Sequence, residues 1–115
     1  MIKIYHNPRC RKSREGLKAV ENSGQAFEII LYHDNVPSKE ELAMILTKLN
    51  IKPINLVRKN EAIWKEKFRK KELTDNQVIE AMVQYPKLIE RPIVIKGFKA
   101  VIGRPLEHIT ELLKT

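Results

Sequence analysis

The order of elements in the first third of the chain constrains the fold more than any other feature. Apolar and polar residues alternate over residues 2–5, which predicts a short strand. The Asn7-Pro8 pair breaks this strand, and a helix is predicted over residues 10–22. Residues 27–32 predict a second strand, more buried than the first. Because one helix and a short loop connect the two strands, they are expected to be parallel neighbours in one sheet.

The middle of the chain is predicted to be helical. Ser38, followed three residues later by Glu41, has the pattern of a capping box, and apolar residues then recur at helical spacing up to residue 49. Another helix is predicted to begin at Thr74 and to end before Pro86. Two short helical pieces are expected between them, over residues 54–57 and 62–68.

The last third predicts a hairpin and a final helix. Two β-branched segments, residues 93–95 and 100–102, flank a turn that contains Gly97. A helix with apolar residues at helical spacing follows over residues 106–113. The complete order, β-α-β, helical block, β-β-α, predicts an α/β fold with a four-stranded mixed sheet. Ligands of open α/β sheets gather at the carboxyl ends of strands, where Cys10 is expected.

Composition indicates a single globular domain over residues 1–115, because 43% of the residues are hydrophobic. The chain has one cysteine, so it forms no internal disulfide, and no Cys/His cluster has the spacing of a zinc site. We therefore expect no metal and no bound cofactor. Neither a signal peptide nor a membrane-spanning segment is recognisable, and a cytoplasmic location is expected.

The net charge of +8 predicts a partner that is an anion, either a nucleic acid or a small oxyanion. The densest basic run, residues 65–72, contains two glutamates and is typical of a solvated helix face. Aromatic residues make up 6% of the chain, too few for a surface on which bases stack. We therefore do not expect nucleic-acid binding.

Cys10 stands where the first strand gives way to the first helix. The free N–H groups of a helix N-terminus stabilise a thiolate and lower its pKa from about 8.5. Four cationic side chains lie within four residues of Cys10, namely Arg9, Arg11, Lys12 and Arg14. The helix N-terminus and these cations together predict a reactive thiol and an anion site. No second cysteine can resolve an adduct on Cys10, so the regenerating thiol must come from another molecule.

Three neighbours of Cys10 are candidate supporting residues, each with two interpretations. Ser13 either hydrogen-bonds the thiolate or caps the helix. His6 either helps to hold the thiolate or is a structural residue of the turn. Arg14, one helical turn after Cys10, either faces the thiol or is solvated. The other two histidines, His33 and His108, are interpreted as surface or helix residues.

Arg58, Arg91 and Arg104 stand apart from the charge runs. Arg91 and Arg104 each precede a proline at the edges of the two late strands, and a cis peptide is allowed at Arg91-Pro92. Taken singly, each of these arginines is typical of a surface salt bridge. Together with a cysteine anion site, their planar donor groups suit a tetrahedral oxyanion.

Residues 5–10, Tyr-His-Asn-Pro-Arg-Cys, together with Ser13-Arg14, resemble the catalytic loop of the glutaredoxin-linked arsenate reductase (ArsC) family. The resemblance continues in the same order through residues 30–32, 56–60, 90–94 and 103–105. It implies a thioredoxin-like fold with a helical insertion over about residues 37–88. It also implies that Pro92 is the cis-proline beside the active cysteine.

The resemblance implies an activity and roles for individual residues. Cys10 would attack arsenate and form a thiol–arsenate adduct, while Arg58, Arg91 and Arg104 would bind the oxyanion. Glutathione would then attack the adduct, and glutaredoxin would reduce the resulting mixed disulfide as arsenite leaves. No cofactor would be bound, and we expect a monomer.

Two features depart from well-characterised arsenate reductases and resemble a shorter branch of the family. Arg11-Lys12 stand where those enzymes carry small residues, and the chain ends soon after its final helix. Two other functions are compatible with the fold. One is a non-enzymatic regulator of the Spx type that binds RNA polymerase, although Ser13 removes the Cys-x-x-Cys switch that many such regulators carry. The other is a glutathione-linked thiol reductase, in which the three arginines would be superfluous.

Overall fold

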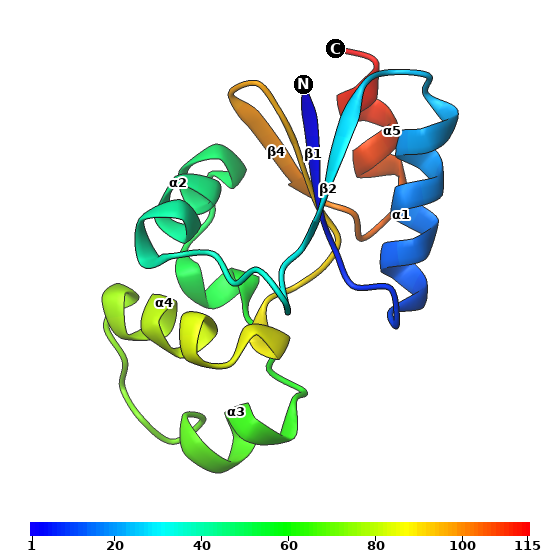
Figure 1. Ribbon diagram of the computed structural model, residues 1–115. Coiled ribbons are helices and arrows are strands. Elements are labelled where there is room, and N and C mark those ends of the chain that lie inside the picture. Colours follow the sequence, from blue (N-terminus) through cyan, green and yellow to red (C-terminus); the bar gives the residue numbers. More distant parts are fainter. The chain divides into compact units, whose positions relative to one another are not determined.

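The computed structural model describes residues 1–115, which divide into two compact units (Figure 1). The first, here called the sheet unit, combines Met1–Asn35 with Arg91–Thr115. The second, the helical unit, is the continuous segment Val36–Glu90. The single domain with an insertion over about residues 37–88 stays a prediction. None of the helices has both the length and the apolar character needed to span a bilayer.

The sheet unit contains a four-stranded mixed sheet in the order β2-β1-β3-β4. The strands are β1 (Ile2–His6), β2 (Phe27–Leu31), β3 (Ile93–Lys96) and β4 (Lys99–Ile102). Strand β1 is parallel to β2 and antiparallel to β3, and β3 is antiparallel to β4. The predicted mixed sheet and the predicted parallel pairing of the first two strands are therefore confirmed.

Helices α1 (Arg11–Asn22) and α5 (Glu107–Leu113) lie side by side in the sheet unit (Figure 1). Their apolar residues join those of β1 and β3 in one core. The seven buried residues of this core are Ile2, Ile4, Val20, Val94, Ile109, Leu112 and Leu113. Burial of this apolar face, rather than helix propensity alone, holds the two helices in place.

The predicted burial of the second strand is wrong. Strand β2 is an edge strand, because β1 is its only neighbour in the sheet order. Ile29 and Leu31 keep 42% and 39% of their surface exposed. A continuous apolar run is typical of a strand with both faces covered, but the same run is compatible with a half-covered edge. The position of a strand within the sheet cannot be deduced from its own residues.

The helical unit contains α2 (Lys39–Leu49), α3 (Ala62–Lys67) and α4 (Asp75–Gln84), with short 3-10 turns η1 (Pro53–Leu56) and η2 (Pro86–Leu88). The starts of both longer helices are capped. The Ser38 hydroxyl accepts the Glu41 N–H at 3.1 Å at the start of α2. At the start of α4, Thr74 and Gln77 form a reciprocal capping box.

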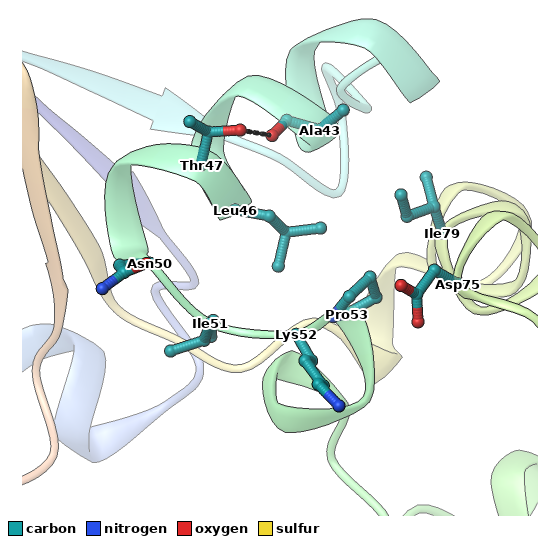
Figure 2. Close-up of a pocket in the computed structure, with 9 residues that line it drawn as sticks. All are labelled: Ala43, Leu46, Thr47, Asn50, Ile51, Lys52, Pro53, Asp75 and Ile79. Atoms are coloured by element: carbon teal, nitrogen blue, oxygen red, sulfur yellow. Dashed lines mark hydrogen bonds between the residues drawn. The ribbon is translucent and has the colours of Figure 1, made fainter.

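A shallow pocket of about 530 Å³ lies between α2, the segment that follows it and α4 (Figure 2). Leu46, Pro53 and Ile79 give it apolar walls, and the Asp75 carboxylate lies on its rim. Asn50, the C-cap of α2, adopts a left-handed conformation at this pocket, with φ of 57°.

Candidate active site around Cys10

A tight loop carries the chain from the end of β1 to the start of α1. The Cys10 N–H donates to the Asn7 carbonyl at 3.0 Å, and the Arg9 N–H donates to the Asn7 side-chain oxygen at 3.0 Å. Cys10 is the N-cap residue of α1 and makes no side-chain cap. Its sulfur therefore lies at the end of the helix where backbone N–H groups are free to donate.

Ser13 connects this loop to strand β1. Its side chain is completely buried, and its Oγ lies 2.6 Å from His6 Nδ1. The same Oγ accepts the Asn7 N–H at 2.9 Å. The Ser13 hydroxyl thus neither caps the helix nor hydrogen-bonds the sulfur. Instead, the backbone N–H of Ser13 is the hydrogen-bond donor to Cys10.

Arg91 and Arg104 are brought together by the hairpin of β3 and β4. Ile93 pairs with Ile102 at the open end of this hairpin, so the residues just outside it are neighbours. The Arg104 Nε donates to the Arg91 carbonyl at 3.0 Å, and Arg104 Nη2 lies 3.4 Å from the Cys10 sulfur. Arg91 is buried and hydrogen-bonds the same sulfur.

Both Arg-Pro peptide bonds at this edge of the sheet are cis. The cis bond at Arg91-Pro92 agrees with the expectation from the sequence, whereas the one at Arg104-Pro105 was not expected. The Gly103 N–H donates to the Pro92 carbonyl at 2.8 Å and joins the two segments. A Cβ at Gly16 of α1 would lie 2.7 Å from Pro92 Cγ, so only glycine allows α1 to approach this proline.

The pKa of Cys10 is lowered from that of a free cysteine thiol. Burial is the largest single influence and by itself raises the pKa, because it disfavours the charged thiolate. The hydrogen bonds from the Ser13 backbone and from Arg91, with the positive charges of Arg91 and Arg104, outweigh it. This balance favours a thiolate, the form of cysteine that acts as a nucleophile.

Arg14 and His33 are both exposed, which agrees with the solvated alternative for Arg14 and with the surface interpretation of His33. Arg14 is exposed, and its Nη1 donates to the Pro8 carbonyl at 2.9 Å, so it braces the loop. His33 follows β2 at the carboxyl edge of the sheet, where Leu31 pairs with His6. The charge of Arg91 acts on it. The sequence analysis did not place His33 at this edge, although the predicted strand that ends just before it was the available signal.

Arg58 belongs to the helical unit. Its N–H donates to the Leu88 carbonyl at 2.7 Å, beside the isolated bridge between Val57 and Ile89. Its side chain lies 3.7 Å from both Glu61 and Glu90. These contacts agree with the interpretation of Arg58 as a salt-bridge partner, and its role toward an oxyanion stays a prediction. No group of three or more His, Cys, Asp or Glu side chains is placed to hold a metal ion.

The sequence profile of the ArsC family matches residues 5–112. The chain belongs to the ArsC family. An arsenate reductase of Neisseria meningitidis is 40% identical over 114 residues, which cover 97% of both chains. The uncharacterised protein YfgD of Escherichia coli K12 is also 40% identical, over 97% of this chain and 96% of its own.

A solved structure, the arsenate reductase from Vibrio cholerae, matches this ArsC-family chain with a TM-score of 0.90 and 41% identity. The match covers 96% of this chain and 95% of that one. The thioredoxin-like fold implied by the sequence is thereby confirmed. Within this ArsC-family fold, Cys10 stands after the central strand β1, and Arg91 and Arg104 flank the neighbouring hairpin.

Proposed function

We propose that this ArsC-family chain reduces arsenate to arsenite, with Cys10 as the nucleophile. One observation carries the proposal: the Cys10 sulfur, with its lowered pKa, lies 3.4 Å from the Arg104 guanidinium and is hydrogen-bonded by Arg91. A thiolate that already faces two guanidinium groups has a nucleophile and an oxyanion binder in one place. The names of the relatives supply the oxyanion, because several are arsenate reductases.

The first step joins sulfur to arsenic. The Cys10 thiolate attacks the arsenic of arsenate, an As–O bond breaks, and the leaving oxygen takes a proton and departs as water. Arg91 and Arg104, together with Arg58, are assigned to the remaining arsenate oxygens, whose negative charge their N–H groups neutralise. His6 and Ser13 keep the loop in shape, while Arg14 braces it at Pro8.

The second step needs an external thiol, because the chain contains no other cysteine. A glutathione thiolate attacks the Cys10 sulfur, a disulfide forms, and the electron pair of the S–As bond passes to arsenic. Arsenic is reduced from the +5 to the +3 state and leaves as arsenite. Glutaredoxin then reduces the mixed disulfide and regenerates the Cys10 thiol. The reducing cytoplasm supplies both reductants, and we expect the chain to work there as a monomer without a bound cofactor.

The test is a reconstituted assay with arsenate, glutathione and glutaredoxin, in which the arsenite released is measured by chromatography. We expect release that depends on all three components and that is lost in Cys10→Ser. Release that equals the Cys10→Ser background would overturn the proposal.

The thiol-reductase alternative is separated from the proposal by Arg91→Gln. We expect this variant to lose arsenite release but to retain slow exchange of Cys10 with glutathione disulfide. A thiol reductase without arsenate chemistry would be active on disulfides and would release no arsenite in either form of the protein.

A further inference from the structure

Two cations next to Cys10 have no role in the mechanism described above. Arg9 and Lys12 are exposed, and neither side chain makes a hydrogen bond or an ion pair. Their basic neighbours are engaged: Arg11 lies 3.7 Å from Glu15, and Arg14 donates to the Pro8 carbonyl. Arg9 and Lys12, here called the entry cations, are therefore free to meet an incoming molecule.

The entry cations lie close to Cys10 along the chain. Arg9 immediately precedes Cys10, and Lys12 is in the first turn of α1, two residues after it. The charge of Arg9 acts on His33, as does that of Arg91, which itself contacts the sulfur. The positive charge of Arg9 therefore reaches the carboxyl edge of the sheet, where Arg91 contacts the sulfur.

Carboxylates do little to cancel this positive charge. No acidic residue occurs between Met1 and Arg14, and the α1 helix has none in its first turn. Glu15 is the first in the sequence and is paired with Arg11, and Asp34 adjoins His33 on the neighbouring strand end. An anion approaching Cys10 therefore meets a net positive field from side chains that are not part of the oxyanion site.

We propose that Arg9 and Lys12 select anionic, carboxylate-bearing small thiols and disulfides as the co-reactants of Cys10. Where this concerns glutathione, it rests on the proposed function. Unit charges separated by less than a Debye length, about 10 Å at 0.1 M salt, attract each other measurably even in water. A carboxylate-bearing thiol is thereby concentrated at Cys10 and held while its sulfur reacts, whereas a neutral thiol is not attracted by these charges.

The selection can be measured without arsenate, through exchange of Cys10 with disulfide probes. The thiolate attacks one probe sulfur, a Cys10–S bond forms, the probe's S–S bond breaks, and the leaving thiolate takes the electron pair. The probes are dianionic dithiobis(nitrobenzoate), neutral hydroxyethyl disulfide and cationic cystamine. Each rate is divided by that of N-acetylcysteinamide, a neutral free thiol, to remove the intrinsic reactivity of the probe.

We expect the normalised rate to fall in the order anionic, neutral, cationic at low ionic strength. The order should flatten at about 1 M salt, where the Debye length is about 3 Å. In the double variant Arg9→Gln/Lys12→Gln, the anionic-to-neutral ratio should fall about fivefold at low salt. The rate with the neutral probe should stay unchanged, which also shows that the Cys10 loop is intact.

The matched control is Lys18→Gln, which removes one exposed charge from the same helix, two turns further from Cys10. It should leave the ratio unchanged. A second variant, Lys12→Glu, should lower the ratio to a similar extent, because replacing a cation by an anion also changes the charge by two units, and a glutamate is well tolerated near a helix N-terminus. An unchanged ratio in the double variant, or an equal fall in Lys18→Gln, would overturn the proposal. A protein that selects anionic probes but releases no arsenite would overturn only the proposed function.

Discussion

At the scale of single residues, the site depends on a hydroxyl that makes no hydrogen bond to the sulfur. Ser13 Oγ joins His6 at the end of β1 to the backbone of Asn7, and it is completely buried. Buried polar groups that lose a partner cost free energy, because they no longer have water to replace it. Ser13 therefore holds the loop, whereas its own backbone N–H and the arginines act on the thiolate.

Ser13→Ala should lower the free energy of unfolding by about 1–3 kcal/mol, because it leaves the Asn7 N–H and the His6 ring without their partner. The pKa of Cys10 should stay lowered, since its donors remain. Urea unfolding and the pH dependence of thiol alkylation measure the two quantities. Thr47→Ala removes an exposed hydroxyl and should change stability by less than about 0.5 kcal/mol. A Ser13→Ala protein as stable as the wild type would contradict this role.

Arg91→Gln should raise the pKa of Cys10. The variant removes a hydrogen bond and a positive charge, while the burial that raises the pKa remains. The midpoint of the alkylation rate against pH should move upward, and the rate at neutral pH should fall. A midpoint equal to that of the wild type would mean that the Ser13 backbone and Arg104 suffice to stabilise the thiolate.

His6 should make stability depend on pH. Burial is the main cause that lowers its pKa from 6.5 in the folded chain. The unfolded chain then binds the proton more readily, so the stabilisation is complete above pH 6.5 and is lost as pH falls through the lower folded pKa. Urea unfolding at several pH values should show this decline, and His6→Asn should reduce its slope. His33, whose pKa is also lowered by burial, contributes with the same sign and should account for the slope that remains.

At the scale of elements, the sequence patterns predicted the kinds of element well and their surroundings poorly. The alternation over residues 2–5 and the capping residues Ser38 and Thr74 are local signals, and each appears in the structure. The burial of β2 depends on which strand lies beside it, which is a long-range property. The pattern of β2 alone therefore led to the wrong expectation.

Gly16→Ala tests the contact between α1 and the segment that precedes β3. The added Cβ would lie 2.7 Å from Pro92 Cγ and 2.9 Å from Ile109 Cδ1. Alanine favours a helix over glycine, but the rigid proline ring cannot move aside as a flexible side chain can. We expect a loss of about 1–3 kcal/mol in thermal or urea unfolding. The control is Lys18→Ala, at an exposed position of the same helix, which should not lower the free energy of unfolding. A Gly16→Ala protein more stable than the wild type would show that Pro92 can move aside.

At the scale of the whole molecule, the proposal assigns oxyanion binding to arginines from distant parts of the chain. Cys10, Arg91 and Arg104 belong to the sheet unit, and Arg58 belongs to the helical unit. Arg58→Ala should lower kcat/KM for arsenate about tenfold or more, which corresponds to about 1.4 kcal/mol of binding to the transition state. Alkylation of Cys10 should be unaffected. Lys59→Ala, the exposed neighbour, is the control, and equal losses in both variants would argue against a specific role for Arg58.

The site itself was predictable only in part from the residues. Cys10 could be identified from its strand-to-helix position, but Arg104 lies 94 residues away in the sequence. No local pattern links residues so far apart. The chemistry of arginine made an oxyanion role plausible, and the resemblance to the ArsC family supplied the assignment to this site. Arg14 is a second example. Its helical spacing from Cys10 allowed its side chain to face the thiol, but the side chain donates to the Pro8 carbonyl instead. A backbone acceptor of this kind leaves no trace in the sequence.

The strand order β2-β1-β3-β4 determines when, during synthesis, the sheet can be completed. The sheet unit is made from the two ends of the chain, and β1 lies between one strand from each end. On the ribosome, β1, α1 and β2 emerge first, but β3 and the two arginines that act on Cys10 emerge only after Glu90. Throughout that interval the cysteine of the nascent chain lacks the Arg91 hydrogen bond and the positive charges of Arg91 and Arg104. The pKa of Cys10 is therefore fully lowered only after residues far downstream of it have been synthesised and packed against its loop.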